Sequence, residues 1–229
     1  MNVKLINYSQ GPIENILGVN VPSKMNLLEQ IAYCARVSNP TNQNNSETSE
    51  KLVRYLIKNQ HWSPLEMVSV CLEINTTRDI ARQILRHRSF SFQEFSQRYA
   101  DASSLGDFET RETRLQDQKN RQNSIENVDI ALAAWWDAEQ KFIGTIIENA
   151  YMNALDKGIA KEQARAILPE GMTKSRMYMN GTLRSWVHYI QLRSANGTQK
   201  EHQLIALACA DAIEPIFPMI KELMNEQQG

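Results

Sequence analysis

Basic and hydroxyl side chains are crowded into residues 82–99 of this 229-residue sequence. The stretch contains four arginines, one histidine, three serines and one carboxylate, mixed with apolar residues. Guanidinium groups keep their charge at neutral pH, and their planar sets of donors match the oxygens of phosphates and carboxylates. Because such charges repel one another unless an anion lies among them, the stretch predicts a binding site for a small phosphorylated ligand.

A basic stretch can also be a solvated surface whose arginines pair with nearby acids. Two features favour the binding site. Arg86 and Arg88 flank His87 where a helical pattern ends. Ser91, Ser96 and Arg98 then follow in a segment without helical periodicity, and binding residues concentrate on irregular segments. We therefore expect irregular backbone after the Arg-His-Arg group.

The sequence contains no glycine-rich G-x-G-x-x-G pattern and no P-loop, so arginine and serine side chains have to hold the phosphates. Six arginines lie at the ends or edges of expected elements. A nucleotide monophosphate and a dinucleotide cofactor would supply enough negative charge for them. These arginines are Arg86, Arg88, Arg98, Arg165, Arg184 and Arg193.

The spacing Arg-His-Arg-x-x-Ser-x-x-x-x-Ser-x-Arg, from Arg86 to Arg98, resembles the signature of the flavin-dependent thymidylate synthases at every specified position. Supporting similarities extend from Ala35–Ser38 to Leu192–Arg193. The resemblance implies a methyltransferase that makes dTMP from deoxyuridine monophosphate (dUMP) without a protein nucleophile. It implies methylenetetrahydrofolate as carbon donor, FAD reduced by NADPH as hydride carrier, and a homotetramer whose sites are shared between subunits.

The resemblance also assigns ligand residues position by position. Those assigned to dUMP are Gln83, Ile84, Leu85, Arg86, Glu94, Phe95, Ser96, Gln97, Arg98, Arg165 and Arg193. Those assigned to FAD are Ser63, Arg86, His87, Arg88, Ser89, Glu94, Thr182, Leu183, Arg184 and His188, with Ser38 and Glu66 as weaker assignments. His61 resembles a histidine near the flavin and the folate; the alternative is a solvated histidine before a proline turn.

Arg193 is the residue expected to act in catalysis. A positive charge beside the uracil stabilises the N3-deprotonated, more electron-rich ring. The order of methylene and hydride transfer stays open. Ser96 belongs to no Ser-His-acid spacing, so we interpret it as a ligand that donates hydrogen bonds. The reduced flavin carries the difficult chemistry, and the protein supplies position and charge.

Composition narrows the class of protein. The 25 basic and 26 acidic side chains give a formal charge of −1, which disfavours binding of polymeric nucleic acid. Cys34, Cys71 and Cys209 lack C-x-x-C spacing, so neither a disulfide framework nor a metal site is indicated, and all three are expected to be buried and inert. Sparse cysteines, no apolar leader and no membrane-length apolar run predict a cytoplasmic protein.

Patterning predicts one α+β domain over residues 1–229, with long helices packed around a small, mostly antiparallel sheet. Strands are expected at 3–8, 68–75 and 173–180. Helices are expected at 25–37, after a cap at Ser46 or Thr48, after a cap at Thr76 or Thr77, at 128–155, at 161–168, at 182–193, and at 198–224 with a break at Pro215 and Pro218.

Three further expectations concern surface and core. Residues 102–127 are polar and predict a solvated or mobile excursion. In the helix at 128–155, the large apolar side chains are expected in the core; they are Trp135, Trp136, Phe142, Ile146 and Ile147. His202 is expected at the surface. Met67 departs from the family, which often has histidine there.

Two other functions fit the same residues: a flavoprotein oxidoreductase without methyl transfer, and a non-catalytic nucleotide-binding protein. One geometric alternative is also open. The chain between Arg86 and Arg98 can stretch to roughly 40 Å, so Arg98 can fold back on Arg86 or reach a neighbouring subunit. The resemblance favours the second arrangement.

Overall fold

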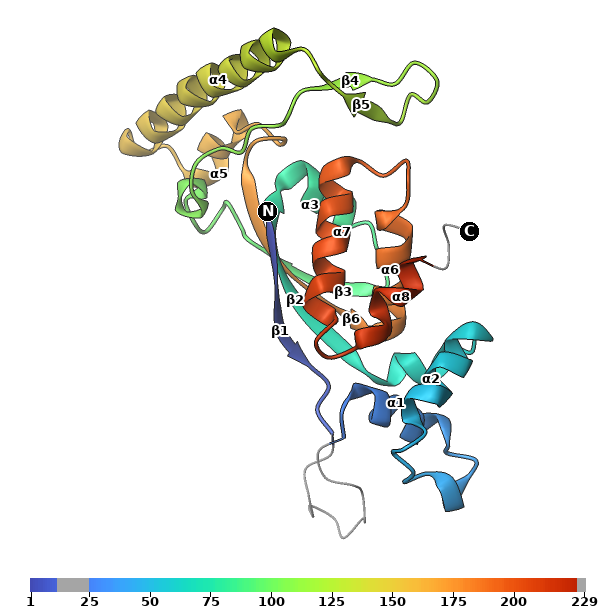
Figure 1. The fold of residues 1–229 in the computed structure, drawn as a ribbon. Helices are drawn as coiled ribbons and strands as arrows, with labels where there is room; N and C mark the ends of the chain where they lie inside the picture. Colours follow the sequence, from blue (N-terminus) through green and yellow to red (C-terminus); the bar gives the residue numbers. More distant parts are fainter. Residues whose placement is uncertain (12–24, 226–229) are drawn as a thin grey trace.

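A four-stranded antiparallel sheet with the strand order β1-β2-β6-β3 lies at the centre of the protein. The computed structural model describes residues 1–11 and 25–225 (Figure 1). The strands are β1 (Asn2–Tyr8), β2 (Ser69–Thr77), β6 (Lys174–Thr182) and β3 (Phe90–Glu94). β2 buries every second residue, including Val70, Leu72 and Ile74, so its predicted alternation is confirmed.

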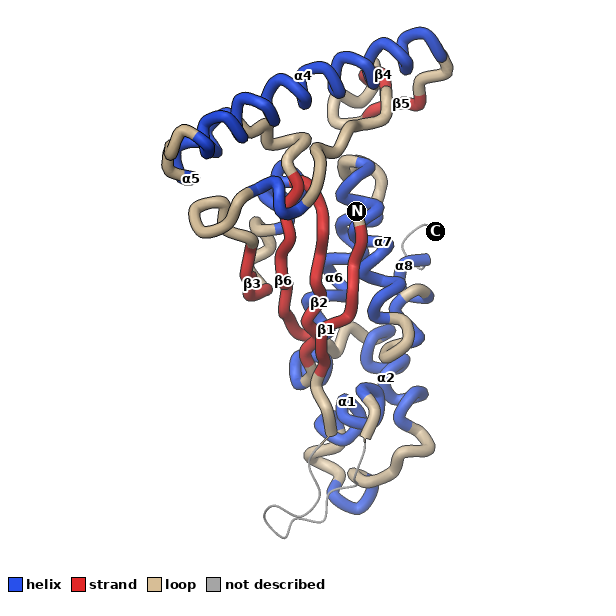
Figure 2. Tube along the Cα trace, turned by 90° about the vertical axis from the view of Figure 1, so that its left-hand side faces the viewer, coloured by secondary structure: helices blue, strands red, loops and turns tan. Residues whose placement is uncertain are grey.

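Helices cover one face of this sheet (Figure 2). α6 (Leu183–Ser194) and α7 (Lys200–Ile213) pack against it, and the Trp186 indole N–H of α6 donates to the Val70 carbonyl at 2.9 Å. α1 (Leu27–Ala35) and α2 (Ser49–Lys58) lie at one end of the sheet. At the other end lie α4 (Ile130–Asp156) and a hairpin of β4 (Arg114–Gln116) and β5 (Ser124–Glu126). The remaining helices are short: α3 (Arg78–Ile84), α5 (Lys161–Ala164) and α8 (Glu222–Asn225).

The predicted α+β class is confirmed, and local chemistry explains several boundaries. Asn26 and Glu29 form a capping box at the start of α1. Gly158 follows α4 with a φ of +79°, a conformation that glycine adopts at little cost. α7 ends at Ile213, just before the predicted break at Pro215.

Thr48 and Thr77 occupy the predicted N-cap positions of α2 and α3, but neither hydroxyl caps its helix. Thr48 Oγ1 instead accepts a hydrogen bond from Arg36 at 2.7 Å. Thr77 Oγ1 donates to Asp79 at 2.5 Å. The prediction of the positions is confirmed, and the prediction of capping bonds is wrong because each hydroxyl has a competing polar partner.

The backbone directly after the Arg-His-Arg group is regular, so the prediction of an irregular segment is wrong for residues 90–94. These residues form β3, an edge strand that pairs with β6. Phe90 and Phe92 alternate with polar residues, which is the period-two pattern of a strand. Phe90 is buried, and its ring lies 4.8 Å from that of Trp186 between centroids.

α4 forms as predicted, but most of its large apolar residues lie outside the core. The exposed side chains include Trp135, Trp136, Phe142 and Ile146, whereas Ile147 is half-buried. The residues of this helix that are buried are Gln140, Gly144 and Tyr151. Large apolar side chains that gather at a protein surface are typical of sites of contact with other molecules.

Residues 102–127 are attached to the body of the protein more firmly than a solvated excursion would be. Arg111 donates to Thr77 Oγ1 at 2.5 Å and to Asp79 at 2.8 Å. Arg114 forms an ion pair with Glu201, which is only 5% exposed. The predicted solvated excursion is therefore wrong for this part of the segment.

His202 is buried with 0% exposure, so its predicted surface position is wrong. It lies three residues before Ile205 and seven before Cys209, on the apolar face of α7. Its pKa is lowered to about 3, mainly by burial and also by the nearby charge of Arg193. The side chain is therefore a neutral hydrogen-bonding group at pH 7.

Cys209 is buried, whereas Cys34 and Cys71 are only partly buried, so complete burial holds for one of the three predicted cysteines. Burial raises the pKa of each thiol. Within residues 1–11 and 25–225, no helix is both long and apolar enough to cross a membrane.

We expect Gly181→Ala to lower the free energy of unfolding by about 1–3 kcal/mol, the usual cost of overpacking a core. A Cβ at Gly181 would lie 2.4 Å from Cδ1 of Phe90. Equilibrium urea unfolding measures the change. Gly171→Ala is the matched control, because a Cβ there meets no atom within 4 Å. Equal stability of the two variants would contradict the close contact between β3 and β6.

Candidate functional site

The Arg-His-Arg group forms a tight turn between α3 and β3. The His87 N–H donates to the Ile84 carbonyl at 3.0 Å, and the His87 carbonyl accepts from the Phe90 N–H at 3.3 Å. Arg86 and Arg88 are exposed, and no carboxylate of the described chain lies within 4 Å of either guanidinium group. Two uncompensated positive charges therefore lie at this turn, as the anion-site prediction requires.

His87 points inward from the same turn and meets Arg193, which is 106 residues away in the sequence. The Arg193 Nε–H donates to His87 Nε2 at 2.9 Å. Nε2 is thus an acceptor, and the imidazole is neutral with its proton on Nδ1. Burial, together with the charges of Arg193 and Arg86, lowers the pKa of His87 to about 4. The sheet and α6 therefore bring Arg193 to the motif.

Gln83 lies in the last turn of α3, next to this group. Its Nε2–H donates to Gln199 Oε1 at 2.8 Å, and its Oε1 lies 3.2 Å from Nδ1 of the buried His202. Both ends of the amide are engaged. Of the residues assigned to dUMP, the structure therefore gathers Gln83, Arg86 and Arg193 around the turn.

A second group of assigned residues lies at the other end of β3. Glu94 accepts a hydrogen bond from Ser175 at 2.6 Å, and the Phe95 N–H donates to the Arg176 carbonyl at 2.8 Å. Arg98 is exposed and lies 3.4 Å from Glu162 of α5. Arg165 is at the end of that short helix. The members of this second group are Glu94, Phe95, Ser96, Gln97, Arg98 and Arg165.

The two groups are separated by β3 itself. The strand contains five residues, and a strand rises about 3.4 Å per residue, so its first and last residues lie about 14 Å apart. Arg98 therefore does not fold back on Arg86 within one chain. Gln97 in the second group is buried, and its Nε2 has no hydrogen-bond partner among the described residues.

A third group, at the start of α6, contains residues assigned to FAD. Arg184 forms an ion pair with Glu66, and the ring of His188 lies 4.6 Å from that of Trp62 between centroids. The pKa of His188 is lowered by partial burial and by Arg184. Thr182 caps α6, because its Oγ1 accepts from the Ser185 N–H at 3.3 Å.

This third group adjoins the Arg-His-Arg turn. Ser185 Oγ donates to the Ser89 carbonyl at 3.4 Å. Ser63 and His61 are exposed on the segment before β2, and the edge of the His61 ring faces Tyr55 at 6.2 Å between centroids. Met67, where the family often has histidine, is also exposed.

Two assigned residues have side chains in the hydrophobic core. Ile84 and Leu183 are 0% exposed. The Ile84 carbonyl accepts from His87, and the Leu183 N–H donates to the Val68 carbonyl at 3.0 Å. Any ligand contact at these positions is therefore left to the other backbone atoms.

Sequence reasoning missed three polar residues that contact His87 and Gln83: Tyr189, Gln199 and His202. Tyr189 is 1% exposed, and its ring packs nearly perpendicular to that of His87, with 4.9 Å between centroids. Gln199 and His202 hold Gln83. Tyr189 lies three residues after Trp186 on the buried face of α6, so helical periodicity could have located it, but no periodicity indicates which polar groups meet across two helices.

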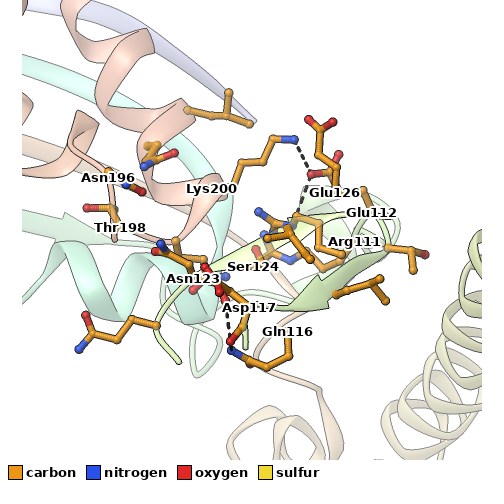
Figure 3. A pocket seen from close by; sticks show the side chains of 18 of the residues that line it. Arg111, Glu112, Gln116, Asp117, Asn123, Ser124, Glu126, Asn196, Thr198 and Lys200 are labelled. Carbon is orange, nitrogen blue, oxygen red and sulfur yellow. Dashed lines mark hydrogen bonds and ion pairs between the residues drawn. The ribbon is translucent and has the colours of Figure 1, made fainter. Parts of the chain in front are cut away.

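An open groove of about 920 Å³ lies between the β4–β5 hairpin, α4 and the start of α7 (Figure 3). None of the residues assigned to dUMP or FAD lines it. Lys200 spans one side through an ion pair with Glu112 at 2.7 Å. Gln199, which accepts the hydrogen bond from Gln83, also lines this groove.

Comparison with known proteins agrees with the motif. Residues 21–219 match the family described as Thymidylate synthase complementing protein. The probable flavin-dependent thymidylate synthase of Paramecium bursaria Chlorella virus 1 is 46% identical over 225 residues, which cover 98% of this chain and 99% of that protein. The flavin-dependent thymidylate synthase of a Synechocystis strain is 50% identical over 190 residues, covering 83% of this chain and 86% of that protein.

Among solved structures, a UMP/dUMP methylase, PolB from Streptomyces cacaoi, bound with 5-Br dUMP, has the same fold. The TM-score is 0.75 at 24% sequence identity, and the match covers 98% of this chain and 94% of that chain. The family match spans strands β2, β3 and β6 of the central sheet and helices α1 to α7, and it includes all three groups of assigned residues. The chain therefore belongs to the flavin-dependent thymidylate synthase family.

Proposed function

We propose that this protein makes dTMP from dUMP, with methylenetetrahydrofolate as carbon donor and with FAD, reduced by NADPH, as hydride carrier. The structural observation that carries the proposal is the Arg193–His87 hydrogen bond, which joins a distant arginine to the family motif in a chain of this family. No protein nucleophile takes part, because Cys209 is buried and burial raises the thiol pKa of all three cysteines. The three unpaired cysteines suit a reducing compartment, so we propose the cytoplasm.

Arginine charges bind the nucleotide in this proposal. Arg86 at the turn, and Arg98 and Arg165 beyond β3, offer donors to the phosphate. Ser96 adds a hydroxyl donor. Arg193 carries the catalytic role: its guanidinium, held by His87, favours the N3-deprotonated uracil, because a nearby positive charge stabilises the anionic form.

The residues at the start of α6 fit a pyrophosphate-containing cofactor such as FAD. Arg184 has a buried Nε–H without a hydrogen-bond partner among the described residues. An anionic oxygen would satisfy that donor. Arg88 and Ser89 contribute further donors at the adjoining turn. Bound FAD supplies the hydride chemistry once reduced, and the protein positions it against the nucleotide.

We also propose a homotetramer whose sites combine residues from different subunits. Two observations support this. The whole of β3, about 14 Å long, lies between the turn and the segment that carries Arg98, which favours a mononucleotide site that takes the turn and Arg98 from different chains. In addition, α4 exposes Trp135, Phe142 and Ile146, an apolar surface suited to burial between subunits.

The direct test is product formation. The FAD-loaded protein is incubated with dUMP, methylenetetrahydrofolate and NADPH, and dTMP is separated by chromatography. We expect dTMP formation that requires all three. NADPH oxidation without dTMP would support a flavoprotein oxidoreductase instead. A protein that shows no flavin absorbance after FAD is added would support a non-catalytic nucleotide-binding protein.

Arg193→Ala is expected to lower turnover by roughly 100-fold or more, the usual effect of removing one charge-stabilising donor from an active site. FAD binding should persist, because the proposed role of Arg193 is on the uracil. Rapid-mixing assays of dTMP formation and flavin absorbance measure the two effects. Arg176→Ala is the control, since Arg176 lies on the exposed face of β6 and pairs with Asn75 at 2.9 Å. Loss of flavin with normal dUMP binding would refute the role.

Arg98→Ala is expected to weaken dUMP binding by about 1.5–3 kcal/mol, the contribution of one charged hydrogen bond. The dissociation constant for dUMP, measured by calorimetry, should rise about tenfold to 150-fold. Glu162→Gln removes the partner of Arg98 in its own chain and keeps the arginine, so it should not weaken dUMP binding. Unchanged dUMP affinity in Arg98→Ala would reject the assignment.

A further inference from the structure

A continuous chain of hydrogen bonds runs from the core to the start of α7. Tyr189 Oη lies 3.1 Å from Nε2 of His202, and Nδ1 of His202 lies 3.2 Å from Oε1 of Gln83. Gln83 Nε2 donates to Gln199 Oε1 at 2.8 Å. Gln199 Nε2 donates to Glu201 Oε2 at 2.8 Å.

The carboxylate of Glu201 sets the direction of this chain. Glu201 is buried and forms ion pairs with Arg114 and Arg111, and a carboxylate only accepts hydrogen bonds. The amide nitrogen of Gln199 must therefore face Glu201, and its oxygen must face Gln83. Gln83 is then obliged to turn its own nitrogen toward Gln199.

The same constraint passes to His202. With its nitrogen on Gln199, Gln83 presents its oxygen to His202, so the imidazole carries its proton on Nδ1 and accepts from the Tyr189 hydroxyl on Nε2. Because its pKa is lowered to about 3, His202 keeps this neutral form at pH 7. A glutamine amide that could otherwise rotate by half a turn is therefore held in one orientation.

The oriented Gln83 amide still has one free N–H and one free oxygen lone pair with which to bind a ligand. A primary amide has two N–H donors and two lone pairs on its oxygen. The chain of hydrogen bonds uses one of each, so one donor and one acceptor remain at fixed positions. At position 4, uracil presents an oxygen acceptor whether or not N3 is protonated, whereas cytosine presents an amino donor there. A freely rotating amide can pair with either base, and a fixed amide pairs with only one.

We propose that His202 and Gln199 are positioning residues that fix the Gln83 amide so that the site prefers a uracil nucleotide over the matching cytosine nucleotide. The proposal rests on the proposed function, because it takes Gln83 to contact the base of dUMP. It adds a source of base selectivity. The buried Glu201 carboxylate orients the Gln199 amide, and Gln199 in turn orients the Gln83 amide.

The test compares binding of dUMP and dCMP to the FAD-loaded protein by calorimetry. Gln199→Leu is the main variant, because Gln199 is exposed and its loss should leave folding intact. His202→Leu removes the other contact, and His202→Asn restores a donor near the Nδ1 position. Gln203→Leu is the control: Gln203 lies one turn along α7 and donates to the Ala195 carbonyl at 2.9 Å, away from Gln83.

We expect Gln199→Leu and His202→Leu to lower the preference for dUMP over dCMP by about three- to tenfold, the effect of one neutral hydrogen bond. His202→Asn should recover part of the preference, and Gln203→Leu should keep all of it. FAD absorbance should be unchanged in Gln199→Leu. A merely structural role would weaken both nucleotides by the same factor and leave the ratio constant.

An unchanged ratio in folded Gln199→Leu overturns the proposal, and so does a wild-type protein that binds dCMP as tightly as dUMP. If His202→Leu fails to fold, Gln199→Leu alone decides. Formation of dTMP by the wild-type protein is measured separately. Its absence would refute the proposed function, whereas normal dTMP formation with an unchanged ratio would refute only the positioning role.

Discussion

A neutral imidazole held beside guanidinium groups is the interaction on which the site depends. His87 accepts a hydrogen bond from Arg193 and can do so only while its Nε2 is unprotonated. Burial and the charges of Arg193 and Arg86 lower its pKa to about 4. A protonated His87 would lose the acceptor and add another positive charge to a crowded turn. The arginines alone therefore set the charge that an anionic ligand meets at neutral pH.

The fold protects this contact from several directions. The Tyr189 ring packs nearly perpendicular against His87, and Phe90 anchors the end of the turn in the core against Trp186. Tyr189 and Arg193 both lie on α6, so the packing that buries Tyr189 also directs Arg193 toward His87. The start of α6 is joined to the turn through the Ser89 carbonyl. Packing, rather than a flexible ligand loop, thus determines where the charged groups lie.

The sequence predicts well what a single segment decides. The alternation in β2 and the apolar stripe of α6 indicate which face is buried, and the spacing from Arg86 to Arg98 identifies the family. The sequence predicts poorly the contacts that form between segments far apart in the chain. His202 meets Gln83 from 119 residues away, and Arg114 meets Glu201 from 87 residues away. The apolar residues of α4 illustrate the same limit, because periodicity identifies an apolar face and not whether the chain itself covers it.

The length of β3 links the chemistry to assembly. One chain presents its turn at one end of the strand and Arg98 at the other, so a mononucleotide held by both needs two chains in the proposed tetramer. A two-fold axis would satisfy this requirement twice. It would bring the turn of each chain to the Arg98 end of β3 in the other chain, so that both shared sites form by the same contact. The exposed face of α4 offers apolar surface for holding the chains together. In such an arrangement, loosening the subunits disables every shared site without altering a single ligand residue, so activity depends on protein concentration as well as on the residues of the turn.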